Sequence, residues 1–178
     1  LSKALSIIEK GSVIASGGSA TIEEVGLLNY IKTHSEEYTF IDRSIAKNEE
    51  EKRQIHAKAI LSYYYLMSTN AFTMYGQLVN IDGNGNRVSA LCYGPKHVVI
   101  ITGMNKLTPS VEDAYKRIRQ DACPPNCVRL GLPTPCSKTG VCGDCMSASS
   151  ICDLFVTTRM SRYPDRIHII MVGEELGY

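Results

Sequence analysis

The sequence predicts a single α/β domain with a mainly parallel sheet flanked by helices. Short apolar segments, typical of buried strands, alternate along the chain with segments whose apolar residues recur at helical spacing. The chain has 178 residues, and a domain of this size buries about 70% of its surface on folding, which is enough for a hydrophobic core. It contains no repeat and no low-complexity tract, so we expect one domain over residues 1–178.

The first half of the chain begins this alternation. Residues 12–16 form an apolar run that ends at a glycine pair, which predicts a buried strand. Thr21 and Glu24 have the spacing of a capping box, so we expect a helix to begin at Thr21. Its apolar stripe consists of Ile22, Val25, Leu28 and Ile31. A second strand is expected at residues 38–41, and a second helix after Asn48, whose acidic first turn suits the helix dipole.

The second half continues with strands. Residues 65–67, 77–81, 87–92 and 98–102 are short apolar or alternating runs. Residues 82–86 favour turns, so we expect a hairpin between the second and third of these runs, with Cys92 in the core. A helix is expected after Thr108 and Pro109, and the last two strands at residues 155–157 and 167–172. Residues 123–152 hold four of the seven prolines and are expected to form an irregular Cys-rich loop within the domain.

Charge and hydropathy exclude several function classes. Nineteen basic residues stand against 18 acidic ones, for a net charge of +1, whereas a nucleic-acid binder that relies on bulk electrostatics is far more basic. The longest apolar runs, such as residues 98–101, are much shorter than the roughly 20 residues of a membrane span. We therefore expect neither a nucleic-acid nor a membrane partner. No secretory leader is visible, and the clustered cysteines favour a reducing compartment, so we expect a cytoplasmic protein.

The segment from Ser16 to Thr21 joins the first strand to the first helix. Its glycines, Gly17 and Gly18, let a ligand approach the backbone, and free amides at a helix start attract anions. Phosphate, carboxylate or pyrophosphate would satisfy such a site, with Ser19 and Thr21 as hydroxyl donors. The segment is neither a Walker loop nor a dinucleotide fingerprint. The alternative is a tight turn that binds nothing.

Polar residues follow the predicted strand at residues 77–81. Asp82 is a candidate base or a ligand for a sugar hydroxyl, and Arg87 is a candidate clamp for an anion. Residues that simply favour a hairpin turn explain the same pattern, and this explanation is preferred on pattern alone. Asn70, upstream of this strand, is likewise either a ligand-binding residue or a residue that favours a turn.

Two lysines flank the strand at residues 98–102. Lys106 follows its carboxyl end, where open α/β sheets gather their ligands. Lys96 precedes the strand and is the weaker candidate, because surface lysines are usually only solvated. The four histidines are scattered, and His56 is expected to be a solvated helix residue.

The thiol cluster is the most distinctive feature of the sequence. Six of the seven cysteines fall between Cys123 and Cys152, and Cys142 and Cys145 form a Cys-x2-Cys pair. Two further thiolates would complete a zinc site or hold an iron–sulfur cluster, although the spacing matches no standard finger. The pair is also compatible with a dithiol redox couple, and the set with reduced thiols packed under a loop.

Several of these motifs together resemble the lactate-utilisation (LUD) domain family. The resemblance covers residues 11 to 178 and rests on Gly17 to Leu27, Leu78 to Val88, Tyr93 to Lys96, Gly103 to Lys106, Cys142 to Cys145 and Glu174 to Tyr178. It points to a stand-alone branch of the family. Members usually carry a helical lead-in, so we expect an N-terminal truncation.

The resemblance implies the fold of ribose-5-phosphate isomerase, glucosamine-6-phosphate deaminase and the coenzyme A transferases. It also implies a role beside oxidoreductase and iron–sulfur subunits in the oxidation of lactate to pyruvate, and related folds often form homodimers. Carried over residue by residue, the ligand-binding candidates are Gly17, Gly18, Ser19, Thr21, Asn70, Asn80, Asn86, Lys96 and Asn105, with Asp82 and Lys106 as catalytic candidates. The cysteines that match the family pattern are Cys136, Cys142, Cys145 and Cys152, as ligands of an iron–sulfur cluster or zinc.

Three functions follow from these features. The first is binding of a small anionic metabolite in organic-acid oxidation with partner subunits. The second is a metal- or redox-responsive Cys-rich binding module without catalysis. The third is an enzyme of the same fold that acts on a sugar phosphate, an acyl-CoA or a folate-linked substrate, with Asp82 as its base.

Overall fold

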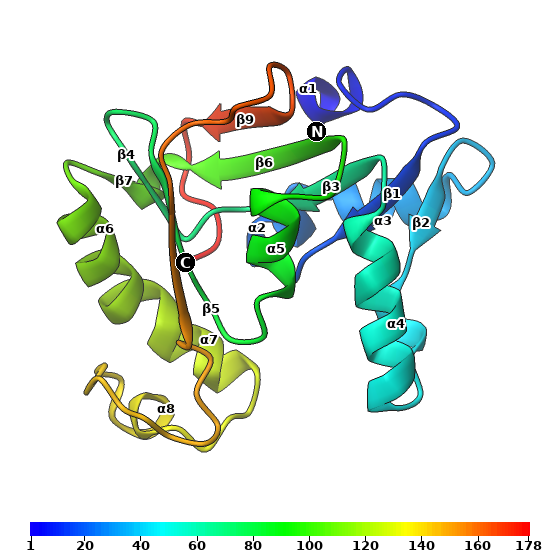
Figure 1. Cartoon of the computed structure of the whole chain (residues 1–178). Helices are drawn as coiled ribbons and strands as arrows, with labels where there is room; N and C mark the ends of the chain where they lie inside the picture. The colour runs from blue at the N-terminus through cyan, green and yellow to red at the C-terminus, as the bar shows by residue number, and fades with distance from the viewer.

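The computed structural model describes residues 1–178 and is built on a five-stranded parallel sheet. The strand order is β2-β1-β3-β6-β9, and every neighbouring pair is parallel. The strands are β1 (Val13–Ser16), β2 (Thr39–Ile41), β3 (Tyr64–Met67), β6 (His97–Gly103) and β9 (Ile167–Val172). Figure 1 shows them stacked side by side, with β9 at one edge. The predicted α/β class with a mainly parallel sheet is confirmed.

A second sheet of four strands, which the sequence pattern did not reveal, lies next to the first. Its order is β7-β4-β5-β8, with β4–β5 and β5–β8 antiparallel and β4–β7 parallel. Its strands are β4 (Ala71–Thr73), β5 (Leu78–Asp82), β7 (Leu107–Thr108) and β8 (Leu154–Thr158). Two of them are too short to show a period in the sequence.

The helices surround these sheets. They are α1 (Ser2–Leu5), α2 (Ala20–Glu24), α3 (Leu27–Thr33), α4 (Glu49–Ile60), α5 (Asn86–Cys92), α6 (Val111–Arg117), α7 (Cys123–Arg129) and α8 (Pro135–Thr139). Shorter turns are η1 (Arg43–Ile45) and η2 (Met104–Lys106), and a π-helical turn, η3 (Ile118–Ala122), joins α6 to α7. In Figure 1, α4 stands on one side and α6, α7 and α8 on the other, with the C-terminus between them. No helix is both long and apolar enough to cross a membrane.

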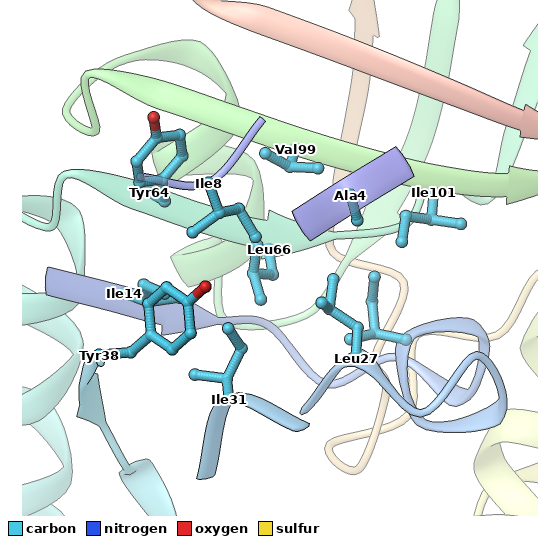
Figure 2. Packing of buried hydrophobic residues seen from close by; sticks show 11 residues of the cluster. Ala4, Ile8, Ile14, Leu27, Ile31, Tyr38, Tyr64, Leu66, Val99 and Ile101 are labelled. Carbon is cyan, nitrogen blue, oxygen red and sulfur yellow. The ribbon is translucent and has the colours of Figure 1, made fainter. Parts of the chain in front are cut away.

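The core lies on both faces of the parallel sheet. Tyr64 and Leu66 of β3 pack with residues of α1, α2 and α3, and Figure 2 shows this cluster. Tyr65 and Met67, which alternate with them, pack toward α4 and α5 on the opposite face. Because β3 is covered on both faces, all four of its residues are apolar or aromatic and buried.

The predicted strand at residues 87–92 is wrong, because these residues form helix α5. Gly85 has a φ of +79° and precedes the helix, while the Asp82 carboxylate accepts a hydrogen bond from the Gly85 amide. Val88 and Leu91, three residues apart, are then buried on one side of the helix. The hairpin around residues 82–86 does not form, and Cys92 is exposed rather than in the core.

The first predicted helix is divided into two. Gly26 has a φ of +72° and separates α2 from α3. Ser19, not Thr21, caps α2, because its hydroxyl accepts a hydrogen bond from the Ile22 amide. As a result Leu27 is fully buried, whereas a single helix through these residues would have placed Leu28 on the buried face.

The Cys-rich segment is only partly irregular. Helix α7 begins at Cys123, and the prolines in its first turn are compatible with a helix because no amide donor is needed there. Thr134 caps α8 through its side chain. The expectation of an irregular loop is therefore wrong for α7 and α8, and residues 140–153 contain no helix or strand.

Candidate functional site

A large cavity lies where the strands of the parallel sheet end. Its volume is about 490 Å³, within the range of small-molecule sites. Residues that follow the carboxyl ends of all five strands line it: Gly18 to Thr21 after β1, Arg43 and Ser44 after β2, Ser68 to Asn70 after β3, Lys106 after β6, and Gly177 and Tyr178 after β9. The chain reverses its direction of winding between β1 and β3, which is the position where open α/β sheets bind ligands.

The charged residues of the cavity wall are mostly basic. Five of its residues are basic and one is acidic; the basic ones are Arg43, Lys52, Arg87, Lys106 and Arg129. The acid, Asp82, already pairs with Arg87 at 3.2 Å. The remaining four basic residues therefore face the cavity without an acidic partner in its wall. We call this space the basic cavity.

Lys106 is the buried member of this set. Its side chain is 3% exposed, and its Nζ donates to Thr21 Oγ1 at 2.9 Å and to Ser68 Oγ at 3.2 Å. Burial, together with the positive charges of Arg117 and Arg87, lowers the pKa of Lys106 to about 8 against the opposing effect of Glu24. The ammonium has hydroxyl partners but no carboxylate partner, which is costly unless an anion approaches.

The C-terminal segment lies across the start of α2. Thr21 donates from its hydroxyl to the Leu176 carbonyl at 3.3 Å, and the Gly177 amide donates to Glu24 Oε2 at 2.7 Å. Glu24 therefore does not complete the capping box that its spacing predicted. The start of α2 is not blocked, because Gly18, Ser19 and Thr21 all line the cavity.

Gly18 and Arg43 lie against each other at the rim of the cavity. A Cβ atom at Gly18 would lie 2.6 Å from Arg43 Nη2, so only glycine leaves the guanidinium in its place. Asp42 caps the turn that carries Arg43. Burial acts to raise the pKa of Asp42, but hydrogen bonds from Lys32 and from Ser44 outweigh it and lower the pKa to about 2. The turn is thus held by an ionised carboxylate.

Arg87 does not serve as the anion clamp that the sequence suggested, because its guanidinium already donates its hydrogen bonds to other groups of the protein. Nε donates to Asp82, Nη1 to Asn80 Oδ1 and the Ser68 carbonyl, and Nη2 to Asn70 Oδ1 and the Ile81 carbonyl. Burial lowers the pKa of Arg87, and the Asp82 charge opposes this effect. Asp82 also accepts from Gly85, so its carboxylate holds the loop and α5 in place as well as facing the cavity.

The other candidates divide into two groups. Asn70 and Asn86 line the cavity. Gly17 is buried against Arg87 and Tyr65, Asn80 is fully buried with its Nδ2 unpartnered, and Asn105 holds the C-terminal segment through the Gly177 carbonyl. These three are beside the cavity wall rather than in it. Lys96 lies before β6, where it contacts Tyr63, and is not part of the cavity.

Several residues of the cavity wall were missed by sequence reasoning, among them Arg43, Lys52, His56, Arg129 and Tyr178. His56 is not a solvated helix residue, since it is half-buried and its Nε2 has no hydrogen-bond partner. Burial lowers the pKa of His56, as do the charges of Arg43 and Lys52. Arg129 Nε donates to the Tyr178 hydroxyl at 2.6 Å, which joins α7 to the C-terminal segment. No local motif marks these residues, because they lie on several different elements.

The cysteines do not assemble as the predicted four-ligand set. No group of three or more cysteine, histidine, aspartate or glutamate side chains is arranged to hold a metal ion. Cys123 and Cys152 have 3.4 Å between their sulfurs, and Cys142 lies 3.5 Å from Arg119 Nε instead. Cys136 is buried beside Thr134, at 3.3 Å from its hydroxyl, and Cys145 is half-buried. The structure thus does not support a metal site at Cys136, Cys142, Cys145 and Cys152.

These observations define a class of α/β proteins in which a basic cavity lies at the carboxyl ends of a parallel sheet, where the order of the strands reverses. The family follows from sequence: the model of the LUD domain matches residues 1–172, and the chain belongs to the LUD domain family. The resemblance drawn from the motifs is therefore confirmed at the level of the family.

Comparison with solved structures found distant similarities. The structure of eIF2B delta from Chaetomium thermophilum is 14% identical with a TM-score of 0.39, over 64% of this chain and 48% of that one. The present chain thus spans about half of that protein. A DUF162 family protein from Deinococcus radiodurans is 12% identical with a TM-score of 0.38, over 97% of this chain and 93% of that one. A comparison with curated proteins returned no match.

Proposed function

We propose that this protein binds a small anionic metabolite in the basic cavity. The observation that carries the proposal is the buried ammonium of Lys106, which has hydroxyl partners only and lies in a cavity where basic residues outnumber acidic ones five to one. Desolvated positive charge without a counter-charge is unfavourable in the folded protein, and an anion relieves this cost when it binds. Such an arrangement is typical of a binding site rather than of a structural core.

The ligand would be held by groups from several elements. Lys106 supplies the buried charge, while Ser19 and Thr21 supply hydroxyls and backbone amides at the start of α2. Arg43 and Arg129 lie on η1 and α7, on different parts of the wall. An anion with more than one charged group would therefore meet more of the basic residues than a simple monocarboxylate.

Membership of the LUD domain family supports a link to lactate and organic-acid oxidation. We propose that the protein works there with oxidoreductase or iron–sulfur subunits in the cytoplasm. A carboxylate such as lactate or pyruvate carries the negative charge that the cavity favours. A sugar phosphate or an acyl-CoA carries it too, and the volume of about 490 Å³ admits a ligand larger than lactate.

Thermal unfolding with a panel of anions tests this proposal. We expect at least one of lactate, pyruvate, a sugar phosphate and an acyl-CoA to raise the melting temperature. At roughly 100 times Kd the rise should be about 5–10 °C for a protein of this size. Lactate or pyruvate as the best ligand supports organic-acid oxidation, whereas a sugar phosphate or acyl-CoA favours an enzyme of the sugar-phosphate or acyl-transfer type.

A pair of glycine variants provides the control. Gly18→Leu places a side chain where Arg43 Nη2 and the cavity now lie, so it should remove the ligand-dependent shift. Gly143→Leu adds the same side chain in open space outside the cavity and should keep the shift. Absence of any shift in the wild-type protein, or an equal loss in both variants, would refute binding in this cavity.

A further inference from the structure

Cys123 and Cys152 lie close enough to form a covalent bond, and they are not the pair that the Cys-x2-Cys motif indicates. The sulfurs of Cys123 and Cys152 are 3.4 Å apart, although 29 residues separate them in the sequence. A disulfide needs about 2.05 Å between its sulfurs, so a small approach of the two side chains is sufficient. Both cysteines are free in this structure.

The backbone positions each of the two thiols. Cys123 is the first residue of α7 and is buried. Cys152 donates from its amide to Ser150 Oγ at 3.0 Å, and the next amide, of Asp153, donates to the Asp82 carbonyl at 3.1 Å. The first bond shapes the turn before Cys152, and the second holds the segment before β8 against the end of β5, with Cys152 next to Cys123 of α7.

The pair belongs to the wall of the basic cavity. Cys123 lines the cavity, and so do Ser150 and Ile151, the two residues directly before Cys152. Ile151 also packs on Gly83, since a Cβ there would lie 3.1 Å from the Ile151 Cα. Any bond between the two sulfurs would therefore tie α7 to the segment at residues 150–152 across one wall of the cavity.

We propose that Cys123 and Cys152 form a reversible disulfide that fixes this wall of the cavity. The oxidant is a small-molecule disulfide. Cys152, which is half-buried whereas Cys123 is buried, meets it first: its thiolate attacks one sulfur and releases one thiolate of the oxidant. Cys123, as thiolate, then attacks the Cys152 sulfur of the mixed disulfide and releases the second. Two protein thiols are oxidised, the small disulfide is reduced to two thiols, and the two protons pass from the protein to them.

Peptide mapping after treatment with oxidised glutathione tests the proposal on the full chain. We expect a peptide that joins Cys123 to Cys152, that disappears on reduction, and a melting temperature at least about 4 °C higher in the oxidised protein. Cys123→Ser and Cys152→Ser should each remove the linked peptide and the temperature rise. Cys92→Ser, which changes an exposed cysteine at the end of α5, should keep both.

Three outcomes would overturn the proposal: no linked peptide, a link between Cys142 and Cys145, or a link between Cys127 and Cys136 that leaves Cys123 and Cys152 free. The mapping is done without an anion, so its result does not depend on the proposed function. The anion affinity of the reduced and oxidised protein is then compared. If no anion binds either form while the linked peptide appears, the proposed function fails and the disulfide stands.

Discussion

The Nζ atom of Lys106 lies 2.9 Å from the Oγ1 atom of Thr21, although 85 residues separate the two in the sequence. This contact joins the end of β6 to the first turn of α2, and it brings a buried positive charge to the helix start. Thr21 in turn donates to the carbonyl of Leu176, so three distant parts of the chain meet at one hydroxyl. The electrostatic cost of this arrangement leads to the first two predictions.

Replacing Lys106 by methionine should stabilise the free protein and remove anion binding. Burial and nearby positive charges lower the pKa of Lys106 from 10.5 to about 8, so at pH 7 the charged form opposes folding by up to about 3 kcal/mol. Methionine fills a similar volume without charge, and it should raise the free energy of unfolding measured in urea. Calorimetric titration should detect no anion binding.

Lys96→Met provides the matched control. Lys96 is an exposed lysine at the other end of β6, outside the cavity. Its replacement should change the unfolding free energy by less than about 0.5 kcal/mol and leave anion binding intact. A loss of stability in Lys106→Met would contradict the assignment of Lys106 as an unpaired charge kept for a ligand.

Anion affinity should depend on pH through Lys106. Because its pKa in the free protein is about 8, the ammonium is charged below that pH and neutral above it. Affinity should stay constant below about pH 8 and then fall by up to tenfold per pH unit as the proton is lost. The stability of the free protein should rise over the same interval, since between pH 8 and 10.5 the unfolded chain binds more protons than the folded one.

Titrations of binding at a series of pH values provide this measurement. In Lys106→Arg the guanidinium stays charged throughout, so any binding that remains should not fall above pH 8. The same fall in the Arg variant would assign the pH dependence to another group.

Arg87→Lys should destabilise the fold although it keeps the charge. Arg87 donates five hydrogen bonds from a side chain that is 13% exposed, and an ammonium has three donors without the planar geometry. Buried acceptors on Asn70, Asn80 and Asp82 would lose partners, at a cost of roughly 2–4 kcal/mol. Urea unfolding measures this loss. Arg53→Lys, an exposed arginine of α4, should cost less than about 0.5 kcal/mol; equal effects would show that the hydrogen bonds of Arg87 contribute little.

Gly177→Ala should displace the C-terminal segment from α2. Gly177 has a φ of +59°, and a Cβ there would lie 2.6 Å from Thr21 Oγ1 and 3.3 Å from Lys106 Nζ. Gly131→Ala is the matched control, with a φ of +65° and open space around the Cβ. Both variants place a side chain at positive φ, which costs about 1 kcal/mol of stability. Any additional loss of stability in Gly177→Ala therefore measures the clash of the new Cβ with Thr21 and Lys106. Equal melting temperatures would mean that the segment is free to move.

The strands of the parallel sheet were predictable because their signal is local. Residues 98–101 are apolar without interruption, which is typical of a strand that is buried on both faces, and the structure places them in β6. Residues 87–92 were less clear, since alternation and helical spacing coexist in a short run. The contact of Arg87 with three polar side chains, which packs the start of α5 against β5, has no counterpart in the local pattern.

The site shows the same division. Gly18, Ser19, Thr21 and Lys106 were recognisable, because each follows a predicted strand and carries chemistry suited to an anion. Arg43, His56 and Arg129 were not, because a basic residue on the surface and one in a cavity wall look alike in sequence. Local composition and periodicity thus indicated the α/β class and the strands of the parallel sheet, and the resemblance of several motifs pointed to the family. Which side chains converge there was settled by strand order and helix packing, since contacts between distant segments depend on the whole folded chain.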